Sequence, residues 1–520
     1  MITAALDIGS NSIHLVVVEI DGEKSFRVLA SGKEMVRLGR SVARDRKLSA
    51  NAMNRAVEAI SKFSLRAREC KATEIIAVAT SATREALNRD EFLERVVEET
   101  GVHIDLLSGI EEARLIALAV VAKQRPRVRQ RLLAIDIGGG STEVSISHKG
   151  EPVVLISFDL GAVRITEQFI TGDPISEKQL RRLRSVLRAV IAHRAPEITK
   201  LGFDLCFGTS GTINALGQIL WHRFHAEKRA TPAYPVSGLP VRLDDLRVLN
   251  EEMALLDLDA RSEIPGLNRA RAEIIVAGGQ LLEALMETLK IDELMTCEWA
   301  LREGVILAQL ARRASAATAS SANLERDPSL RGALALVEHF QSDRKHATKV
   351  AHLAQHLFDS LRPLHLLGTE YRRLLVAAAL LHDIGKFVSH TNHHKHSAYL
   401  IGCSDLTGFM TSEVKIIANL ARYHRSSLPK PKHPYYAALA EADREVVRKL
   451  SALLRVADAL DRDHEGRVRS LTCSYDDKKV SLTAVCSRVS DATQYRIEDR
   501  SDLFSEVFGR KIEFEIKLAG

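Results

Sequence analysis

One run of acidic, glycine and hydroxyl residues, Asp136-Ile-Gly-Gly-Gly-Ser-Thr-Glu143, lies between two apolar runs, and taken alone it forms either an ordinary hairpin or a phosphate-binding turn. Adjacent glycines let backbone N–H groups approach an anion, because no Cβ obstructs them and positive φ costs little. An aspartate at the end of a strand repels phosphate unless a hard cation lies between them, so Asp136 implies bound Mg²⁺. The residues expected to hold phosphate here are Gly138, Gly139, Gly140, Ser141 and Thr142.

The N-terminus repeats this plan of strand, aspartate, glycine turn, hydroxyls and strand, in Asp7-Ile-Gly-Ser-Asn-Ser12. Asp7 again implies Mg²⁺, and Gly9, Ser10, Asn11 and Ser12 are the expected phosphate contacts. The pair indicates an internal duplication, in which two facing hairpins would grip one phosphate chain from both sides.

Two further segments follow predicted strands. Gly208-Thr-Ser-Gly-Thr212 opens a helix, and helix N-termini bind anions, so we expect phosphate contacts from Gly208, Ser210, Gly211 and Thr212. Thr80–Arg84 is predicted as a loop at the carboxyl end of strand 75–79, the position at which open α/β sheets place ligand groups.

Glu111 and Glu112 occupy the first turn of a helix predicted to follow Ser108. One of them is expected only to complement the helix dipole. The other is a candidate for activating water. Helix spacing alone does not decide between them.

The whole chain has 520 residues, which favours three to four domains. Its 46% hydrophobic and 27% charged residues exclude disordered and fibrous classes. The formal charge is +6, and basic residues gather at 123–131 and 222–229, as solvated faces or as contacts for a polyanion. Six scattered cysteines without a CxxC pair favour a reducing compartment and argue against zinc or disulfides.

The apolar runs are too short for a membrane span, and the N-terminus enters a strand directly, so a cytoplasmic location without membrane attachment is expected. No nucleic-acid partner is expected.

Alternation of strands and helices predicts two α/β lobes, 1–127 and 128–313, with a helix at 50–69 capped by Ser49. A Ser/Ala-rich stretch, 314–323, is typical of a linker. Residues 324–466 are predicted to be all-helical, and 467–520 to form a small α+β domain.

The helical region is rich in histidine. Adjacent His382 and Asp383, together with His346 and Asp458 on other helices, suggest a second metal site, with Lys386, His396 and His424 nearby. Alternatively these residues form a structural or polyanion-binding surface.

These motifs, with Ala300-Leu-Arg-Glu-Gly304, resemble those of the exopolyphosphatase and guanosine pentaphosphate phosphohydrolase family over essentially the whole chain. The resemblance implies two duplicated lobes of the actin, sugar-kinase and Hsp70 type (ribonuclease H-like), an HD-like helical domain and a homodimer. It also implies that Glu112 polarises the attacking water and that Arg84 contacts the reacting phosphoryl group. Asp136 and Glu143 would hold Mg²⁺, with help from Asp7. Many members of this family have a degraded motif in the helical domain, whereas the set here looks complete.

Four functions remain open from the sequence. The first is an Mg²⁺-dependent exopolyphosphatase that releases orthophosphate from inorganic polyphosphate. The second is hydrolysis of the 5′-terminal phosphate of guanosine pentaphosphate. The third is an actin-like ATP binder or kinase, for which Val276–Gly279 would be an adenosine-site turn. The fourth is a sensor whose HD-like domain carries the output.

Overall fold

The computed structural model describes residues 1–22, 25–40, 42–225, 237–317, 324, 327–487 and 500–518. The end of the predicted basic group at 222–229 and most of the predicted linker therefore lie outside the described residues. The chain forms two compact units, Met1–Ala311 and Arg312–Gly520. The predicted four-domain division stays a prediction.

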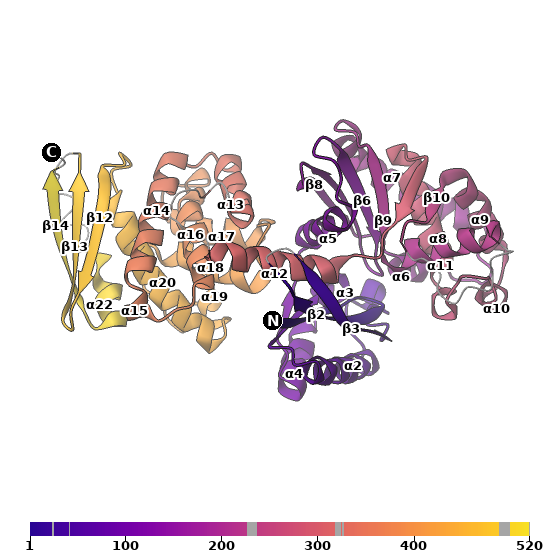
Figure 1. Cartoon of the computed structure of the whole chain (residues 1–520), viewed down its shortest axis with the longest axis horizontal. Coiled ribbons are helices and arrows are strands. Elements are labelled where there is room, and N and C mark those ends of the chain that lie inside the picture. The colour runs from indigo at the N-terminus through magenta and orange to yellow at the C-terminus, as the bar shows by residue number, and fades with distance from the viewer. Residues whose placement is uncertain are drawn as a thin grey trace. The chain divides into compact units, whose positions relative to one another are not determined.

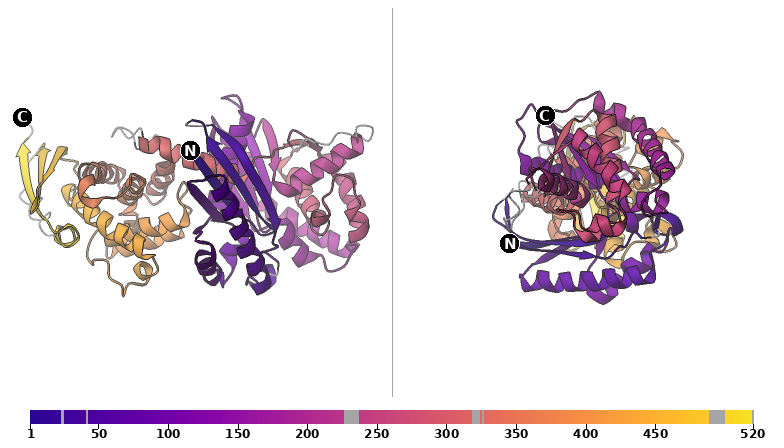
Figure 2. Two further views of the ribbon diagram at one scale, coloured as in Figure 1. Left: turned by 60° about the horizontal axis from the view of Figure 1, so that its bottom comes forward. Right: turned by 90° about the vertical axis from the view of Figure 1, so that its right-hand side faces the viewer.

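The first lobe is built on a five-stranded sheet of order β3-β2-β1-β4-β5. Its strands are β1 (Ile2–Ile8), β2 (Ser12–Ile20), β3 (Phe26–Met35), β4 (Glu74–Ala79) and β5 (Ile104–Leu106). Strands β1 to β3 form an antiparallel meander, and β4 and β5 add in parallel. Helix α2 (Ala50–Glu69) packs on the sheet with α4 (Arg89–Thr100) alongside it (Figure 2). The side chain of Ser49 accepts from the N–H of Ala52, so the predicted N-cap is confirmed.

The second lobe repeats this order in a six-stranded sheet, β10-β11-β9-β6-β7-β8. Its strands are β6 (Arg131–Ile137), β7 (Thr142–His148), β8 (Glu151–Phe158), β9 (Leu205–Thr209), β10 (Pro240–Arg242) and β11 (Glu293–Thr296). Strands β6 to β8 again form an antiparallel meander, and β9 again pairs in parallel with its first strand. The predicted duplicated α/β fold of the actin type is therefore confirmed.

The remaining helices of this unit connect the strands and cover the sheets (Figure 1). They are α1 (Val42–Asp45), α3 (Ser81–Glu85), α5 (Gly109–Gln124), α6 (Ala162–Phe169), α7 (Glu177–Thr199), α8 (Ser210–Phe224), α9 (Leu243–Leu255), α10 (Leu258–Ser262), η2 (Arg269–Arg271), α11 (Ile275–Leu289) and α12 (Leu301–Ala317). The boundary between the two units falls inside α12, and residues 314–317 of the predicted linker are helical.

Two local predictions were wrong. Thr80–Arg84 is not a loop, because helix α3 begins at Ser81 and has Arg84 in its last turn. Val276–Gly279 is not a turn, because these residues lie in helix α11. A side chain on Gly278 or Gly279 would collide with Thr212 or Asn250, so close helix packing accounts for these glycines.

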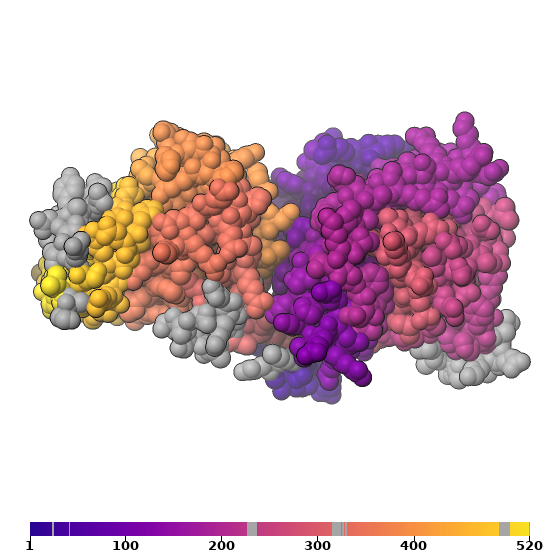
Figure 3. Space-filling model, turned by 90° about the horizontal axis from the view of Figure 1, so that it is seen from above, coloured from indigo at the N-terminus to yellow at the C-terminus, as the bar shows by residue number. Residues whose placement is uncertain are grey.

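The second unit is a helical bundle followed by a three-stranded sheet. Its helices are α13 (Pro328–His339), α14 (Arg344–Ser360), α15 (Arg362–His365), α16 (Glu370–Leu381), η4 (Ile384–Phe387), α17 (His393–Cys403), α18 (Thr411–Tyr423), α19 (Pro434–Ala437), α20 (Glu441–Leu460) and α22 (Asp502–Phe508). Strands β12 (Val468–Tyr475), β13 (Lys479–Cys486) and β14 (Lys511–Leu518) follow in that sheet order. One apolar core runs through the helices and the sheet, which lie directly against each other in Figure 3.

Among the described residues, no helix combines the length and the apolar character that crossing a membrane requires.

Candidate active site

The two glycine hairpins close through the same backbone hydrogen bond. The N–H of Gly9 donates to the carbonyl of Ser12 at 3.1 Å, and the N–H of Gly138 donates to that of Ser141 at 3.0 Å. The hairpins also meet, since a Cβ on Gly140 would lie 2.8 Å from the hydroxyl oxygen of Ser10. The structure therefore brings the two predicted hairpins together, with space only for glycine at their contact.

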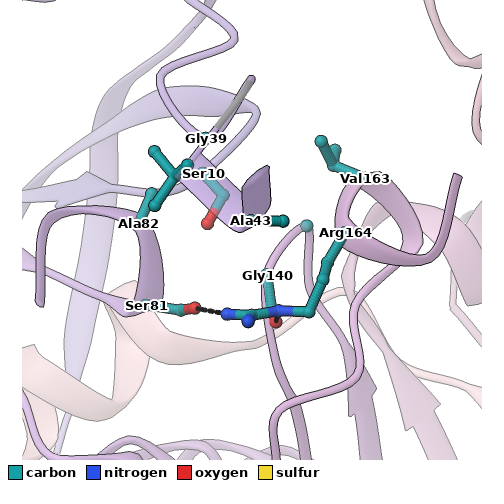
Figure 4. Close-up of a pocket in the computed structure, with 10 residues that line it drawn as sticks. Ser10, Gly39, Ala43, Ser81, Ala82, Gly140, Val163 and Arg164 are labelled. Atoms are coloured by element: carbon teal, nitrogen blue, oxygen red, sulfur yellow. Dashed lines mark hydrogen bonds between the residues drawn. The ribbon is translucent and has the colours of Figure 1, made fainter. Parts of the chain in front are cut away.

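A small pocket at this contact is lined by residues of both lobes (Figure 4). Arg164 crosses it from α6. Its Nε donates to the carbonyl of Gly140 at 2.7 Å, its Nη2 donates to the hydroxyl of Ser81 at 3.2 Å, and it forms an ion pair with Glu85. Arg164 thus joins α3 of the first lobe to the hairpin of the second.

Four acidic side chains, which we call the carboxylate centre, gather beside the hairpins: Asp7, Glu112, Asp136 and Glu143. Asp7 lies at the end of β1 and Glu112 in the first turn of α5, while Asp136 and Glu143 are partners in the β6–β7 ladder. The last three are only 7%, 4% and 2% exposed. The structure therefore brings together the residues predicted as base and metal ligands.

Burial dominates the electrostatics of this centre. Removal from water disfavours the charged form and raises the pKa of Asp7 to about 7, that of Asp136 to about 6 and that of Glu112 to about 8. The pKa of Glu143 is also raised well above its usual value, by burial first and then by the neighbouring Glu112 and Asp136. Buried carboxylates of this kind require a cation to remain ionised together.

The hydrogen bonds leave acceptor oxygens for such a cation. Ser210 donates to Oδ2 of Asp136 at 2.6 Å, and Ser157 donates to Oε1 of Glu143 at 2.9 Å. Oδ1 of Asp7 and Oε2 of Glu143 are buried and have no hydrogen-bond partner among the described residues. Hard oxygen ligands suit Mg²⁺, so the side chains present fit this ion.

Glu112 and its neighbour Glu111 have different surroundings. Nη1 of Arg84 lies 3.5 Å from Oε2 of Glu112 and donates to the carbonyl of Leu107 at 2.7 Å. Glu111 instead forms two hydrogen bonds with Arg114, at 2.6 and 2.7 Å. Only Glu112 is thus placed among the carboxylates, beside Arg84.

Several hydroxyl groups that were predicted to contact phosphate form hydrogen bonds to other protein groups instead. Ser12 is 2.8 Å from Nε2 of His14, and Thr142 donates to the carbonyl of Leu160 at 2.5 Å. Ser210 is bonded to Asp136, as described above, and Thr212 packs against Gly278.

Of the remaining predicted phosphate contacts, some interact with other protein groups and others stay at the contact between the two lobes. Ser141 lies beside Glu143 and offsets part of the rise in its pKa, the carbonyl of Asn11 accepts from the N–H groups of Val36 and Arg37, and Gly208 packs against Ile213. Ser10 and the backbone of the hairpin glycines remain at the contact between the lobes.

Three cations near the centre were missed by the sequence analysis. The guanidinium of Arg271 lies over Gly211 at the start of α8, so that a side chain on Gly211 would collide with it. Arg302 lowers the pKa of Asp7 by its charge. Burial, followed by Arg271 and Arg302, lowers the pKa of Lys33 to about 8. Of these three cations, only Arg302 lies in a motif that the sequence analysis singled out, the segment 300–304.

The second unit holds two compact groups of three ligand atoms, each within 4.8 Å of one another: His346, His382 and Asp383, and Asp383, His393 and His424. These are the only such groups among the described residues, so the carboxylate centre is more widely spaced. Asp458 lies beside the first group, 3.5 Å from Nε2 of His382. His396, named above as a neighbour, belongs to neither group.

A duplicated actin-like fold with facing acidic hairpins defines a class of phosphoryl-transfer proteins. Within that class, this chain belongs to the Ppx/GppA phosphatase family. The model of the Ppx/GppA phosphatase family matches residues 16–313, and that of Ppx/GppA phosphatase, domain III, matches residues 330–497. The family resemblance identified from the motifs is confirmed, and the chain is a hydrolase of the phosphatase type.

Among relatives, a guanosine-5′-triphosphate,3′-diphosphate pyrophosphatase of Aeromonas hydrophila is 31% identical over 483 residues, 92% of each chain. One of the same name from Aeromonas salmonicida is 30% identical over the same share. Among solved structures, an exopolyphosphatase from Cytophaga hutchinsonii has a TM-score of 0.55 at 26% identity, covering 60% of this chain and 98% of that one. The Aquifex aeolicus family member has a TM-score of 0.50, also at 26% identity, with the same coverage.

Proposed function

We propose that this chain is an Mg²⁺-dependent exopolyphosphatase, which hydrolyses the terminal phosphoanhydride of inorganic polyphosphate and releases orthophosphate. The observation that carries the proposal is the position of Glu112. Its buried carboxylate lies beside Arg84 and the other members of the carboxylate centre, next to the two glycine hairpins. The exopolyphosphatase from Cytophaga hutchinsonii supports the choice of substrate.

In this reaction a water attacks the terminal phosphorus in line with the leaving oxygen, and the carboxylate of Glu112 accepts a proton from that water. Arg84 contacts the equatorial oxygens, where negative charge must be stabilised in the transition state. Its hydrogen bond to the carbonyl of Leu107 fixes the guanidinium for this role. One P–O bond forms and one breaks, giving orthophosphate and a polyphosphate that is one phosphate unit shorter.

Asp136, Glu143 and Asp7 would hold the Mg²⁺, which supplies positive charge to neutralise the phosphate oxygens. A cation beside Glu112 also favours its ionised form, which a general base requires. The hydroxyl of Ser210 orients Asp136 for this task.

The phosphate groups that follow the terminal one along the substrate would contact the three cations Lys33, Arg271 and Arg302. Burial and then the charges of Arg271 and Arg302 lower the pKa of Lys33, and a polyanion bound beside these cations would relieve that repulsion. The backbone of the hairpin glycines, Gly9 and Gly138–Gly140, would donate N–H groups to the terminal phosphate.

Guanosine pentaphosphate is the second candidate substrate, since it offers the same kind of terminal phosphoanhydride. It is favoured by the Aeromonas relatives, whose similarity extends over 92% of the chain. A homodimer and a cytoplasmic location, inferred above from the resemblance and the sequence, also stay predictions.

One comparative assay tests the proposal: orthophosphate release from long polyphosphate, short polyphosphate and guanosine pentaphosphate, at equal Mg²⁺. We expect kcat/KM to be highest for polyphosphate. A higher value for guanosine pentaphosphate would replace the first candidate by the second. Transfer of phosphate from ATP to an acceptor, without orthophosphate release from either substrate, would support the kinase alternative instead.

A further inference from the structure

Six side chains of the helical unit, which we call the histidine centre, converge in its core: His346, His382, Asp383, His393, His424 and Asp458. They come from α14, the end of α16, the start of α17, the end of α18, and α20. All six are at most 5% exposed. Burying so many polar groups is costly unless each has a partner.

Each histidine uses its Nδ1 for a bond within the protein. Nδ1 faces a backbone carbonyl in His382 (2.7 Å), His424 (2.8 Å) and His393 (3.0 Å), and Oδ2 of Asp461 in His346 (2.9 Å). A carbonyl cannot donate, so Nδ1 carries the proton and Nε2 of a neutral ring offers its lone pair. This is the second-shell arrangement that orients a metal-binding histidine.

All four Nε2 atoms point at carboxylate oxygens. Those of His346 and His382 lie 3.7 and 3.6 Å from Oδ2 of Asp383, and 3.6 and 3.5 Å from Oδ1 of Asp458. Both Nε2 atoms are buried, and neither has a hydrogen-bond partner within the described part of the chain. These separations are long for hydrogen bonds. They are near the roughly 3.0–3.4 Å that separates two ligands of one ion with bonds of about 2.1 Å.

Asp383 divides its two oxygens between two groups of ligands. Oδ2 faces His346 and His382, whereas Oδ1 lies 3.0 Å from Nε2 of His393 and 4.0 Å from Nε2 of His424. A carboxylate that faces one ligand group with each oxygen can bridge two ions.

An ordinary buried histidine in the same unit has different surroundings. In His365, Nε2 lies 2.9 Å from the carbonyl of Phe358, and Nδ1 accepts from the N–H of Leu367 at 3.0 Å. Both of its nitrogens therefore have backbone partners. Burial alone does not account for the unpartnered Nε2 atoms of the histidine centre.

We propose that the histidine centre binds two first-row transition-metal ions bridged by the carboxylate of Asp383, and that this pair hydrolyses a phosphate ester. Imidazole with carboxylate favours such ions over Mg²⁺. His346, His382 and Asp458 complete one site, and His393 and His424 complete the other. The second site has three protein ligands and thus open positions for water.

The edge of the centre indicates an anionic substrate. Lys386 forms an ion pair with Asp383, Nη1 of Arg462 lies 3.6 Å from Oδ2 of Asp458, and Nη1 of Arg425 lies 3.5 Å from Nε2 of His393. The side chains of Lys386 and Arg462 are 27% and 32% exposed, so solvent reaches the cations but not the ligands. In the reaction, the oxygen of water bonds to phosphorus, the ester P–O bond breaks, and a proton of that water passes to the departing oxygen.

Metal uptake by the full-length chain tests the two-ion assignment. The chain is stripped with a chelator and given excess Mg²⁺ to occupy the carboxylate centre. Co²⁺ is then titrated, while its visible absorption reports nitrogen ligands. We expect two Co²⁺ per chain, one in His393→Gln or His424→Gln, and none in Asp383→Asn.

His394→Gln is the matched control, because His394 is the next residue of α17, is 4% exposed and belongs to neither ligand group. It should retain two ions, and circular dichroism should show that every variant is folded. Uptake of no ion, or of a single ion that His393→Gln and His424→Gln leave in place, would overturn the proposal.

Hydrolysis is tested in the Glu112→Gln chain loaded with Mn²⁺, with 4-nitrophenyl phosphate and bis(4-nitrophenyl) phosphate as probes. We expect nitrophenol release from at least one probe, at a rate at least tenfold above that of the Glu112→Gln/Asp383→Asn chain. Two bound ions with no release above that background would overturn the phosphate-ester assignment.

Discussion

The carboxylate centre and the histidine centre both bury several ionisable side chains close together, but they do so with different ligand atoms. In the first unit, four carboxylates at strand ends and one helix start offer only oxygen. In the second unit, four imidazoles with two carboxylates converge from helices. Because hard ions prefer oxygen ligands and imidazole favours transition metals, we expect Mg²⁺ in the first centre and a transition metal in the second.

The two centres also differ in how their ligands are fixed. In the carboxylate centre, the hydroxyl groups of Ser210 and Ser157 each donate to one carboxylate oxygen, while other oxygens have no partner among the residues that the structure describes. In the histidine centre, each ring is fixed through Nδ1 by a carbonyl or by Asp461. The comparison gives four predictions, taken from the largest expected effect to the smallest.

Glu112→Gln should lower kcat for orthophosphate release from polyphosphate by about 10²–10⁴-fold, since an amide cannot accept the proton of water. The measurement is steady-state phosphate release, with thermal unfolding to show that the variant is folded. Hydrolysis of phosphate esters at the histidine centre should persist, because its ligands lie in the other unit.

Glu111→Gln is the adjacent control for this substitution. It breaks a buried pair with Arg114 and should lower Tm while leaving kcat within a few-fold. If Glu111→Gln abolished turnover and Glu112→Gln did not, the assignment of the base would be reversed.

Chelation should abolish orthophosphate release, and Mg²⁺ alone should restore it at least tenfold above the stripped protein. Mg²⁺ alone should leave hydrolysis of bis(4-nitrophenyl) phosphate at the stripped level, which Mn²⁺ should raise. Equal restoration of both reactions by Mg²⁺ would remove the distinction between the two centres.

Ser210→Gly should raise the Mg²⁺ concentration for half-maximal activity about tenfold, because the orienting bond to Asp136 is lost. Glycine is the preferred replacement, since Ser210 has a φ of +66° that other side chains rarely adopt. Ser157→Ala tests the equivalent bond to Glu143. An unchanged Mg²⁺ dependence in both variants would show that these hydroxyls do not position a metal ligand.

Metal-free protein should lose stability as pH rises from about 5 to 8. Folding raises the pKa of Asp136 to about 6, of Asp7 to about 7 and of Glu112 to about 8, so the folded state holds protons that the unfolded chain has released. This stability is fully present below the ordinary carboxyl pKa near 4 and is lost as pH rises through the raised values. We expect Tm to fall by about 2–4 °C for each kcal/mol lost, and Mg²⁺ to offset the fall increasingly at higher pH. A Tm that rises over this pH interval would contradict the raised pKa values of these carboxyl groups in the folded, metal-free protein.

Prediction from sequence succeeded where local pattern and structure agree. The long helix α2 has both an apolar face and an N-cap at Ser49, and the two hairpins share a pattern that needs no tertiary information. It failed at α3, whose five residues are too few for a periodic signal. At Gly278 and Gly279 the glycines reflect packing against Thr212 and Asn250, which a turn pattern cannot distinguish from a ligand site.

The site shows the same division. Asp136 and Glu143 could be predicted from one motif, whereas Arg164 reaches Gly140 from α6 and Arg271 reaches Gly211 from η2 without any local signal. Likewise, His382 and Asp383 are adjacent in sequence, but His393 and His424 join Asp383 only through the packing of α17 and α18.

The strand pairing of the two hairpins has a consequence for symmetry. Asp136 pairs with Glu143 in the second lobe, but the equivalent partner of Asp7 in the first lobe is His14. Burial and neighbouring cations hold the pKa of His14 well below its usual value, so this ring is neutral. The two halves of the duplication are thus chemically inequivalent, because the position of the acid Glu143 in the second lobe is taken by a neutral imidazole in the first.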